Sequence, residues 1–295
     1  MEILTVENLS KNYGNIRALK NVSFSVPRGT VFGILGPNGS GKTTLLGIIM
    51  DVLKASGGGY KLFGEEPTHT QRKHIGTLLE TPNFYHYLSA VQNLRIAASI
   101  KERGGEDIDR VLEIVNLTAR KDSRFSTYSL GMKQRLAIGS ALLGNPDVLV
   151  FDEPTNGLDP VGIAEIRELI RKLSFEGKTI IMASHLLDEV EKVCTHVAIL
   201  KQGTLITHGD VNEILVNEDM VELSAADLEQ LKTALMQFPG AGKVDISENV
   251  VRVFFPSGQS DLAAVNRYCF NQGIVLSKLQ LKKKSLESKF FELTN

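Results

Sequence analysis

A glycine-rich segment near the N-terminus also carries a lysine and a threonine. Residues 36–43 read GPNGSGKT and match the pattern G-x-x-x-x-G-K-S/T. Glycines in such a loop let backbone N–H groups converge on phosphate oxygens, while Lys42 can place its charge on the β- and γ-phosphates and Thr43 can offer a hydroxyl to Mg²⁺. An apolar, strand-like run precedes the loop and an apolar, helix-like run follows it, as this chemistry requires. The residues of the predicted nucleotide-phosphate site are Gly36, Pro37, Asn38, Gly39, Ser40, Gly41, Lys42, Thr43 and Thr44.

Two adjacent carboxylates end a second apolar run. Residues 148–154 read VLVFDEP, in which Asp152 can hold Mg²⁺ and Glu153 can polarise an attacking water. Successive strand residues point to opposite faces, so both side chains can serve one site only where the strand ends and the backbone turns. A further run, IIMASH, ends in His185, which could contact the γ-phosphate and the attacking water. An acidic strand end or a strand-end histidine alone is also typical of an ordinary loop, so the phosphate loop carries much of this prediction.

The segment TYSLGMKQRL, residues 127–136, has the features of a helix start. Ser129 can cap the helix, Gly131 lies two residues further on, and the cationic Lys133 and Arg135 follow. A helix N-terminus with free backbone N–H groups binds anions readily. The chain therefore has two candidate phosphate sites, far apart in the sequence.

Strand-like runs alternate with helix-like runs up to about residue 217, which favours an α/β core. Apolar strands that run into functional residues are typical of a sheet whose ligands lie at the carboxyl ends of its strands. Residues 86–143 carry almost only helical signals and predict a helical subdomain, and THVAILKQGTLITHG predicts a hairpin that turns at Gln202 and Gly203. We expect a nucleotide-binding domain over residues 1–217.

The pattern changes after residue 217. Residues 218–295 predict the order β-α-β-β-α-β of a small, ferredoxin-like α+β domain, with turns at Pro239–Gly240 and at residues 247–249. We find no catalytic grouping in it. The segment LKKKS fits either a basic contact patch or, more typically, a strand edge guarded by solvated lysines.

The overall composition excludes several classes of protein. The 295 residues carry a formal net charge of −1, so no global field attracts nucleic acid or an anionic membrane. The two cysteines, Cys194 and Cys269, have no metal-binding spacing and favour a reducing compartment. The first residues lack the layout of a signal peptide, and no apolar run approaches the ~20 residues needed to span a bilayer. We expect a cytoplasmic protein, or one attached to a membrane only through another protein.

These motifs, in this order and spacing, resemble the ABC (ATP-binding cassette) ATPases over about residues 2–217. The family signature, usually LSGGQ, is similar to YSLGM followed by KQR. The resemblance implies an α/β P-loop core with an antiparallel β subdomain and a helical subdomain, and ATP with Mg²⁺ as ligands. In the family, the signature helix binds the γ-phosphate held by a second domain, and two domains packed head-to-tail bury two ATP molecules. The two candidate phosphate sites would then be halves of one composite site, completed in a homodimer or with a homologous ATPase subunit.

The resemblance also assigns roles to further positions. Tyr13 resembles the aromatic residue that stacks on adenine, although an ordinary surface tyrosine would look the same, and Asp159 in NGLDP lies in the loop through which two protomers meet. His185 matches the switch histidine and Glu153 the catalytic base. Glu80 occupies the position of a usual glutamine that organises Mg²⁺ and reports to the membrane partner.

The signature also departs from its usual form. It retains Ser129 and Gly131 but has Leu130 in place of a glycine and Met132 in place of a glutamine. Ser129 can still donate to phosphate, so we expect the site to function. An ionised carboxylate at Glu80 could coordinate Mg²⁺ but could not donate a hydrogen bond.

The segments ETPNFYHYLSAVQNL and YSLGMKQRLAIGSALLGNP and the tail SLESKFFELT resemble the branch of ABC proteins that serves exporters of drugs, antibiotic peptides and polysaccharides. This implies an ATPase subunit that powers transport, and more specifically export, through separate integral membrane permease subunits. The chain would then lie on the inner face of the cell membrane, attached through those subunits. The stretch NFYHYL would lie near the groove that accepts a permease helix, or else be buried inside the helical subdomain. The transported substrate is chosen by the permease.

Two other classes are considered. A soluble ABC ATPase acting on ribosomes or DNA is an alternative, but such proteins usually carry two cassettes or long insertions between the motifs, and this chain has neither. A P-loop kinase or GTPase would share GPNGSGKT but would not account for YSLGMKQR, DEPTNGLD and ASH in order. We expect no nucleic-acid partner.

Overall fold

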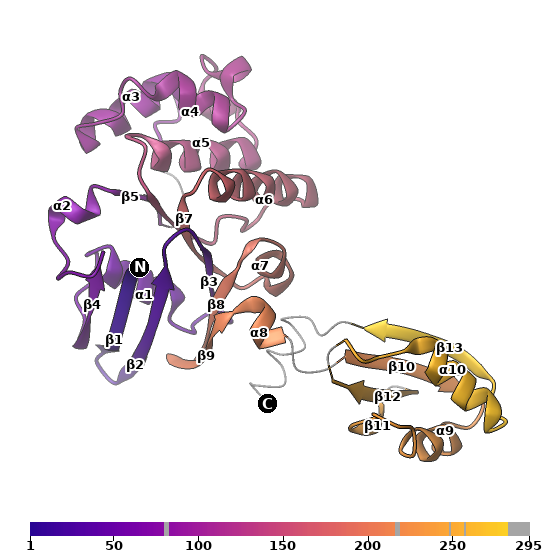
Figure 1. The fold of residues 1–295 in the computed structure, drawn as a ribbon. Helices are drawn as coiled ribbons and strands as arrows, with labels where there is room; N and C mark the ends of the chain where they lie inside the picture. Colours follow the sequence, from indigo (N-terminus) through magenta and orange to yellow (C-terminus); the bar gives the residue numbers. More distant parts are fainter. Residues whose placement is uncertain (80–82, 216–218, 248, 257, 283–295) are drawn as a thin grey trace. The chain divides into compact units, whose positions relative to one another are not determined.

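The computed structural model describes residues 1–79, 83–215, 219–247, 249–256 and 258–282 (Figure 1). The chain divides into two compact units, Met1–Asp210 and Val211–Asn295. Each unit has a hydrophobic core of its own. Among the described residues, no helix is long and apolar enough to cross a membrane.

The first unit is built on a six-stranded sheet with the order β5-β6-β7-β3-β8-β9. All neighbouring strands are parallel except β8 and β9, which form an antiparallel hairpin. The residues of β3, β6 and β7 are all buried, which explains their unbroken apolar sequences. The bounds are Val31–Leu35 for β3, Ile75–Leu78 for β5, Val148–Asp152 for β6, Thr179–Ser184 for β7, His196–Lys201 for β8 and Thr204–Asp210 for β9.

The predicted hairpin turn is confirmed. Gln202 and Gly203 join β8 to β9 with φ angles of 48° and 79°. Positive φ at both central residues is the geometry of a two-residue hairpin turn that matches the twist of the strands.

A second, antiparallel sheet covers helix α1 (Lys42–Ile49) from the other side. Its strand order is β2-β1-β4, with β1 at Glu2–Tyr13, β2 at Ile16–Pro27 and β4 at Gly57–Leu62. Leu45, Leu46, Ile48 and Ile49 of α1 belong to one core with residues of both sheets. The helix that follows the phosphate loop is therefore fixed between two sheets, which holds the loop in place.

Helices gather at one end of the first unit, above the large sheet in Figure 1. Three of them, with two short 3-10 turns, occupy the range predicted to be helical. Helix α6 packs against α5, and α7 lies beside α6 and β3. The bounds are His69–Arg72 for α2, Ala90–Lys101 for α3, Ile108–Ile114 for α4, Leu130–Leu142 for α5, Pro160–Phe175 for α6 and Leu187–Val193 for α7, with 3-10 turns at Thr118–Arg120 and Phe125–Thr127.

The second unit begins with the short helix α8 and continues in the order β-α-β-β-α-β. Its four antiparallel strands have the order β11-β12-β10-β13, so β13 forms one edge. Side chains from α9 and α10 pack with one face of the sheet, around Val221, Val253 and Cys269. The bounds are Val211–Leu215 for α8, Asp219–Ala225 for β10, Leu228–Leu235 for α9, Val244–Ser247 for β11, Val250–Phe255 for β12, Leu262–Asn271 for α10 and Leu276–Lys282 for β13.

Candidate functional site

The phosphate loop joins β3 to α1 through backbone conformations that only glycine adopts easily. Gly36 has a φ of 155°, and a Cβ at this residue would lie 2.3 Å from the Leu200 carbonyl oxygen and 2.5 Å from Ser40 Oγ. Gly41 has a φ of 105° and caps α1 without a side chain, so the first N–H groups of the helix are left for a ligand. The loop has the form that the sequence pattern implies.

Lys42 is nearly buried, with 5% of its surface exposed, and its ammonium group lies inside the loop. Its Nζ donates to the carbonyl oxygens of Gly36 (2.8 Å) and Pro37 (3.3 Å) and lies 3.4 Å from Glu153 Oε1. The loop residues and Glu153 together line a cavity of about 310 Å³. The buried Ser40 hydroxyl has no hydrogen-bond partner among the described residues. A glycine cradle with a buried cation and an unsatisfied hydroxyl fits a phosphate group.

At the end of β6 the backbone turns between the two carboxylates. Asp152 is still in the strand and 4% exposed. Glu153 has a φ of 48°, a left-handed conformation that costs free energy in a residue with a Cβ. Its N–H donates to the Ala183 carbonyl oxygen (3.0 Å), which ties the turn to the neighbouring strand β7. The turn directs the Glu153 side chain toward Lys42.

Glu153 is also bonded to the predicted switch histidine. Its Oε2 lies 2.8 Å from His185 Nδ1 and accepts from the His185 backbone N–H (3.3 Å). Lys42 occupies the other oxygen, so one carboxylate joins the phosphate loop to the ends of β6 and β7. Of the three residues named from the sequence as catalytic, Glu153 therefore contacts both of the others, Lys42 and His185.

The donors at this site are suited to Mg²⁺. Thr43 lines the phosphate-loop cavity, and Asp152 lies at the adjacent strand end. Among the described residues there is no cluster of three His, Cys, Asp or Glu side chains that could hold a metal ion. Magnesium at nucleotide sites needs only one or two protein ligands, because phosphates and waters complete its shell. Glu80, the third predicted ligand, lies outside the described residues.

The helix start at residues 129–131 is present and forms a group of its own. Ser129 caps α5 by accepting a hydrogen bond from the Met132 N–H (3.3 Å), which leaves its hydroxyl proton available for donation. Asp159 caps α6 in the same way, accepting from the Gly162 N–H at 2.8 Å. A Cβ at Gly131 would lie 3.9 Å from the Gly162 Cα, so the starts of the two helices lie side by side.

This helix pair is separate from the phosphate loop within one chain. Ser129, Gly131 and Asp159 do not line the phosphate-loop cavity. Tyr13 does not line it either; the residue is 45% exposed, and Lys11 Nζ lies 5.0 Å from the centre of its ring. The chain thus presents a phosphate loop with its carboxylates and, elsewhere, an exposed helix start.

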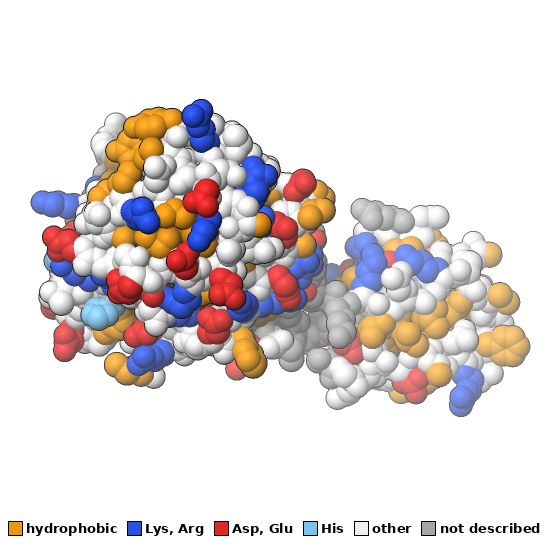
Figure 2. Space-filling view, turned by 90° about the horizontal axis from the view of Figure 1, so that it is seen from above, with side chains coloured by type: hydrophobic (Ala, Val, Ile, Leu, Met, Phe, Trp, Pro, Cys, Tyr) orange, Lys and Arg blue, Asp and Glu red, His pale blue; other side chains and the backbone are white. Residues whose placement is uncertain are grey.

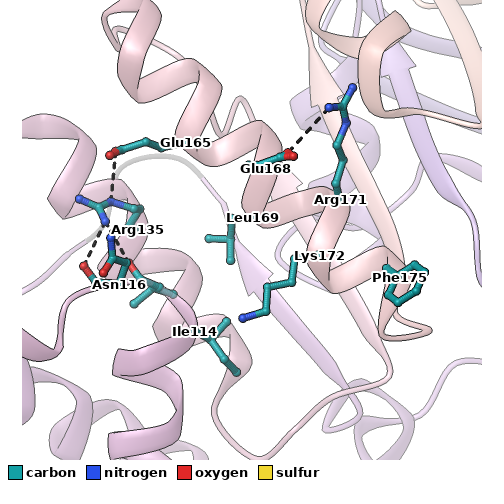
Figure 3. A pocket seen from close by; sticks show the side chains of 10 residues that line it. Ile114, Asn116, Arg135, Glu165, Glu168, Leu169, Arg171, Lys172 and Phe175 are labelled. Carbon is teal, nitrogen blue, oxygen red and sulfur yellow. Dashed lines mark hydrogen bonds and ion pairs between the residues drawn. The ribbon is translucent and has the colours of Figure 1, made fainter.

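Sequence reasoning missed the side chain that fixes α5. Arg135 Nη1 donates to the carbonyl oxygens of Val115 (3.2 Å) and Asn116 (3.1 Å), and its Nε lies 3.5 Å from Glu165 Oε2 of α6. Figure 3 shows this guanidinium between α4 and α6, at one end of a groove of about 600 Å³ that continues along α6 to Phe175. The only signal in the sequence was a cation in the second turn of the predicted helix.

The phosphate loop after β3, the acidic end of β6 and the histidine after β7 define a P-loop nucleoside triphosphatase with a parallel sheet. The family described as "ABC transporter" matches residues 19–156. An ABC transporter ATP-binding protein of Bacillus subtilis, YhcH, is 37% identical over 99% of this chain and 96% of its own length. The chain therefore belongs to the ATP-binding proteins of ABC transporters. Such subunits hydrolyse ATP and work with membrane permease subunits.

Two further comparisons agree with this assignment. The bacitracin transport ATP-binding protein BcrA of Enterococcus faecalis is 33% identical over 99% of this chain and 96% of its own. Among solved structures, cbiO1 from Clostridium perfringens, part of the transporter complex cbiONQ, is 30% identical with a TM-score of 0.65, covering 81% of this chain and 96% of its own. The soluble alternative that acts on ribosomes or DNA is not favoured.

Proposed function

We propose that the chain hydrolyses ATP at a composite site, with Lys42 on the β- and γ-phosphates and Glu153 as the general base. The observation that carries this is the contact of Glu153 with both Lys42 and His185. When a triphosphate enters, Lys42 exchanges its carbonyl partners for phosphate oxygens, and Glu153 is released to orient water. His185 then holds the carboxylate and reaches toward the γ-phosphate. Mg²⁺, held by Thr43 and Asp152, would neutralise the charge that develops on the phosphates.

The second half of the site is proposed to come from another chain, as a homodimer or with a homologous subunit. Ser129 and Gly131 start a helix whose N-terminal dipole favours a phosphate, yet they lie apart from the cavity of their own chain. Asp159 and the start of α6 lie beside them and would form part of the same contact surface. Tyr13 is exposed and able to stack on adenine at the edge of the site.

A groove between β5 and α3 is proposed to hold the permease. It has a volume of about 770 Å³ and is lined by aromatic and aliphatic side chains that include Phe84, Ile96 and Ala97. Asn93 shapes it from beneath, accepting from the Tyr85 N–H (2.8 Å) and donating to the carbonyl oxygen of Ser89 (3.0 Å). A preformed apolar groove of this kind accepts an amphipathic helix. Figure 2 shows hydrophobic side chains gathered at the helical end of this unit.

We propose the following assignment for the whole chain. Residues 1–217 form the nucleotide-binding domain and residues 218–295 a ferredoxin-like accessory domain. The protein would lie in the cytoplasm, peripheral to the inner face of the cell membrane through its permease. Similarity to a bacitracin transport protein supports export as the direction.

Replacing Lys42 tests the hydrolytic site. Lys42→Ala removes the buried charge and should weaken ATP binding by about ten- to a hundredfold, the value of a charge-assisted hydrogen bond, and abolish hydrolysis. Fluorescent-nucleotide titration and phosphate release measure the two effects. Lys54→Ala, at an exposed lysine outside the cavity, is the matched control. Normal hydrolysis by Lys42→Ala would refute the assignment.

A substitution that introduces a negative charge into the groove between β5 and α3 tests the proposed permease contact. Ala97→Asp should abolish recovery of a polytopic membrane protein when the tagged chain is purified from detergent-solubilised membranes with ATP. Phe175→Asp, at a residue 95% exposed on a different groove, should leave that recovery unchanged. Stoichiometric ribosomal proteins or nucleic acid in place of a membrane protein would contradict the proposal.

A further inference from the structure

A second, strongly basic pocket lies beside the permease groove. It has a volume of about 300 Å³. One wall is formed by α2 and the start of β5, and the other by the carboxyl end of α3 and the residues that follow it. It shares Ile100 with the groove. Five of its eight lining residues are basic side chains, and one is acidic: His69, Arg72, Lys73, Lys101 and Arg103, with Glu102.

The two cations at the end of α3 have no carboxylate partner among the described residues. Lys101 Nζ donates to the Ser140 carbonyl oxygen (2.5 Å), which carries no net charge. The Arg103 side chain packs on Gly144, where an added Cβ would lie 2.7 Å from its Cδ, and its guanidinium makes no described hydrogen bond or ion pair. Burial, and then the charge of Arg103, lower the pKa of Lys101 to about 8. Both effects disfavour the protonated amine when the pocket is empty.

The cations on the other wall are only partly neutralised. Arg72 lies 3.2 Å from Asp51 and donates to the Tyr60 hydroxyl (2.8 Å), but its buried Nε has no partner among the described residues. Lys73 pairs with Glu102 at 3.6 Å, through side chains that are 46% and 79% exposed. Such exposed pairs contribute little to stability and exchange easily for another partner. Asp51 and Glu102 thus pair with Arg72 and Lys73, and the positive charges of Lys101 and Arg103 are left without a carboxylate partner among the described residues.

We propose that this pocket binds a phosphate-bearing anion, with Lys101 and Arg103 as its principal ligands and Arg72 and Lys73 around them. A guanidinium binds phosphate in a bidentate manner and an ammonium acts as a point charge, so the pair is complementary to a phosphate monoester or diester. The phosphate comes either from a phospholipid head group or from a free phosphate compound. We favour the phospholipid head group as the source, and this choice rests on the proposed function: a chain that binds a permease through the neighbouring groove would lie next to the membrane.

Binding is measured on the whole chain saturated with ADP, so that the phosphate loop is occupied. One arm uses co-sedimentation with vesicles of phosphatidylcholine alone and of an equimolar mixture with phosphatidylglycerol. The other uses calorimetry with inorganic phosphate. The test variant is Lys101→Gln with Arg103→Gln, and the matched control removes two exposed charges of the same unit, Lys20→Gln with Lys54→Gln. Arg103→Gln alone keeps the Lys101–Ser140 bond and serves if the double variant is unstable.

The wild-type chain should bind the anionic vesicles, and the double variant should bind at least about tenfold more weakly, with the control unchanged. The chain could instead bind inorganic phosphate in the calorimeter but not the vesicles, with phosphate binding lost in the double variant. This result would support the pocket and assign it to a free phosphate compound. No binding in either arm, or equal loss in the control, would overturn the proposal. ADP affinity should be the same in all variants, so this outcome is independent of the hydrolytic site.

Discussion

At the scale of single residues, the backbone turn at Glu153 is what would let two neighbouring carboxylates serve the proposed site. Its left-handed backbone costs about 1 kcal/mol or more. Contacts from two parts of the chain hold it: Lys42 after the phosphate loop, and Ala183 and His185 at the end of β7. The requirement for a turn after Asp152 could be predicted from the alternation of side chains along a strand. The contact with His185 could not, because it depends on how β6 and β7 are aligned.

Glu222 is a residue whose role the sequence did not indicate. It lies on β10 with 2% of its surface exposed, and Lys278 (2.7 Å), Lys282 (3.2 Å) and Arg252 (3.3 Å) surround it. The hydrogen bond from Lys278, then contacts with Lys282, outweigh burial and lower the pKa of Glu222 to about 2 from 4.5. Lys282 belongs to the segment LKKKS, read from the sequence as a basic contact patch or a solvated strand edge; it is exposed on the edge strand β13 and also pairs with this buried carboxylate.

The lowered pKa predicts a pH-dependent stability of the second unit. A carboxyl whose pKa is lower in the folded than in the unfolded state stabilises the fold at pH values above its unfolded-state pKa. For Glu222 this stabilisation is present above about pH 4.5 and is lost as the pH falls toward 2. Glu222→Gln should lower the free energy of unfolding by about 2 kcal/mol at neutral pH and flatten its decline between those values. Urea unfolding and hydrogen exchange of β10 amides in the full chain measure both effects.

Asp245→Asn is the matched control for this prediction. It removes a carboxylate of the same sheet whose partner, Lys243, is 73% exposed. Such a pair contributes about 1 kcal/mol or less. Equal destabilisation by the two substitutions would contradict the special role of Glu222.

At the scale of elements, the start of α5 carries the second half of the proposed site. Gly131→Asp would place a carboxylate where the γ-phosphate of another chain is expected, while the helix tolerates an acidic residue in its first turn. Hydrolysis should fall at least about tenfold with ATP affinity unchanged. Gly131→Ala is the uncharged comparison and should reduce steady-state phosphate release less than Gly131→Asp, since its methyl group carries no charge and the nearest atom of its own chain would be 3.9 Å away. Full activity of Gly131→Asp would exclude this helix from the site.

Arg135 is expected to couple α5 to its neighbours. Arg135→Met removes its bonds to the Val115 and Asn116 carbonyl oxygens and its ion pair with Glu165, shown in Figure 3. The partly buried Val115 carbonyl oxygen then loses a charged donor, so unfolding of the first unit in urea should become easier by about 1–3 kcal/mol.

A nearby arginine on α6 provides the comparison. Arg171→Met breaks an exposed pair with Glu168, 3.7 Å apart, and a solvent-exposed hydrogen bond to the Lys192 carbonyl oxygen (2.8 Å). Because water can replace both contacts, the substitution should cost less than about 1 kcal/mol. If the Arg135 and Arg171 variants unfolded at the same urea concentration, the bracing role of Arg135 would be wrong.

The elements themselves were largely predictable, since local signals specify them. The apolar strands β3, β6 and β7 and the glycine-rich loop have distinctive sequences, and the turn at Gln202 and Gly203 is set by residues that accept positive φ. Clusters such as Lys101 with Arg72, or Glu222 with Lys278, join residues from separate elements. Their spacing in the sequence carries no signal, because strand register and helix packing create them.

At the scale of the whole molecule, the two parts of the proposed phosphate site lie apart within one chain. Lys42, Glu153 and His185 are in contact, whereas Ser129 and Gly131 lie outside their cavity. The proposed site is therefore complete only when a second chain of the same kind binds, and ATP should control this binding.

The most direct test is the mass of the Glu153→Gln chain with ATP, measured by size-exclusion chromatography with light scattering. Glutamine keeps the size of the side chain but removes the base, so ATP should remain bound and unhydrolysed. We predict a doubling of the 32.4 kDa mass with ATP, and no doubling with ADP or when Gly131→Asp is added. A chain that binds ATP to saturation and stays monomeric would contradict the composite site.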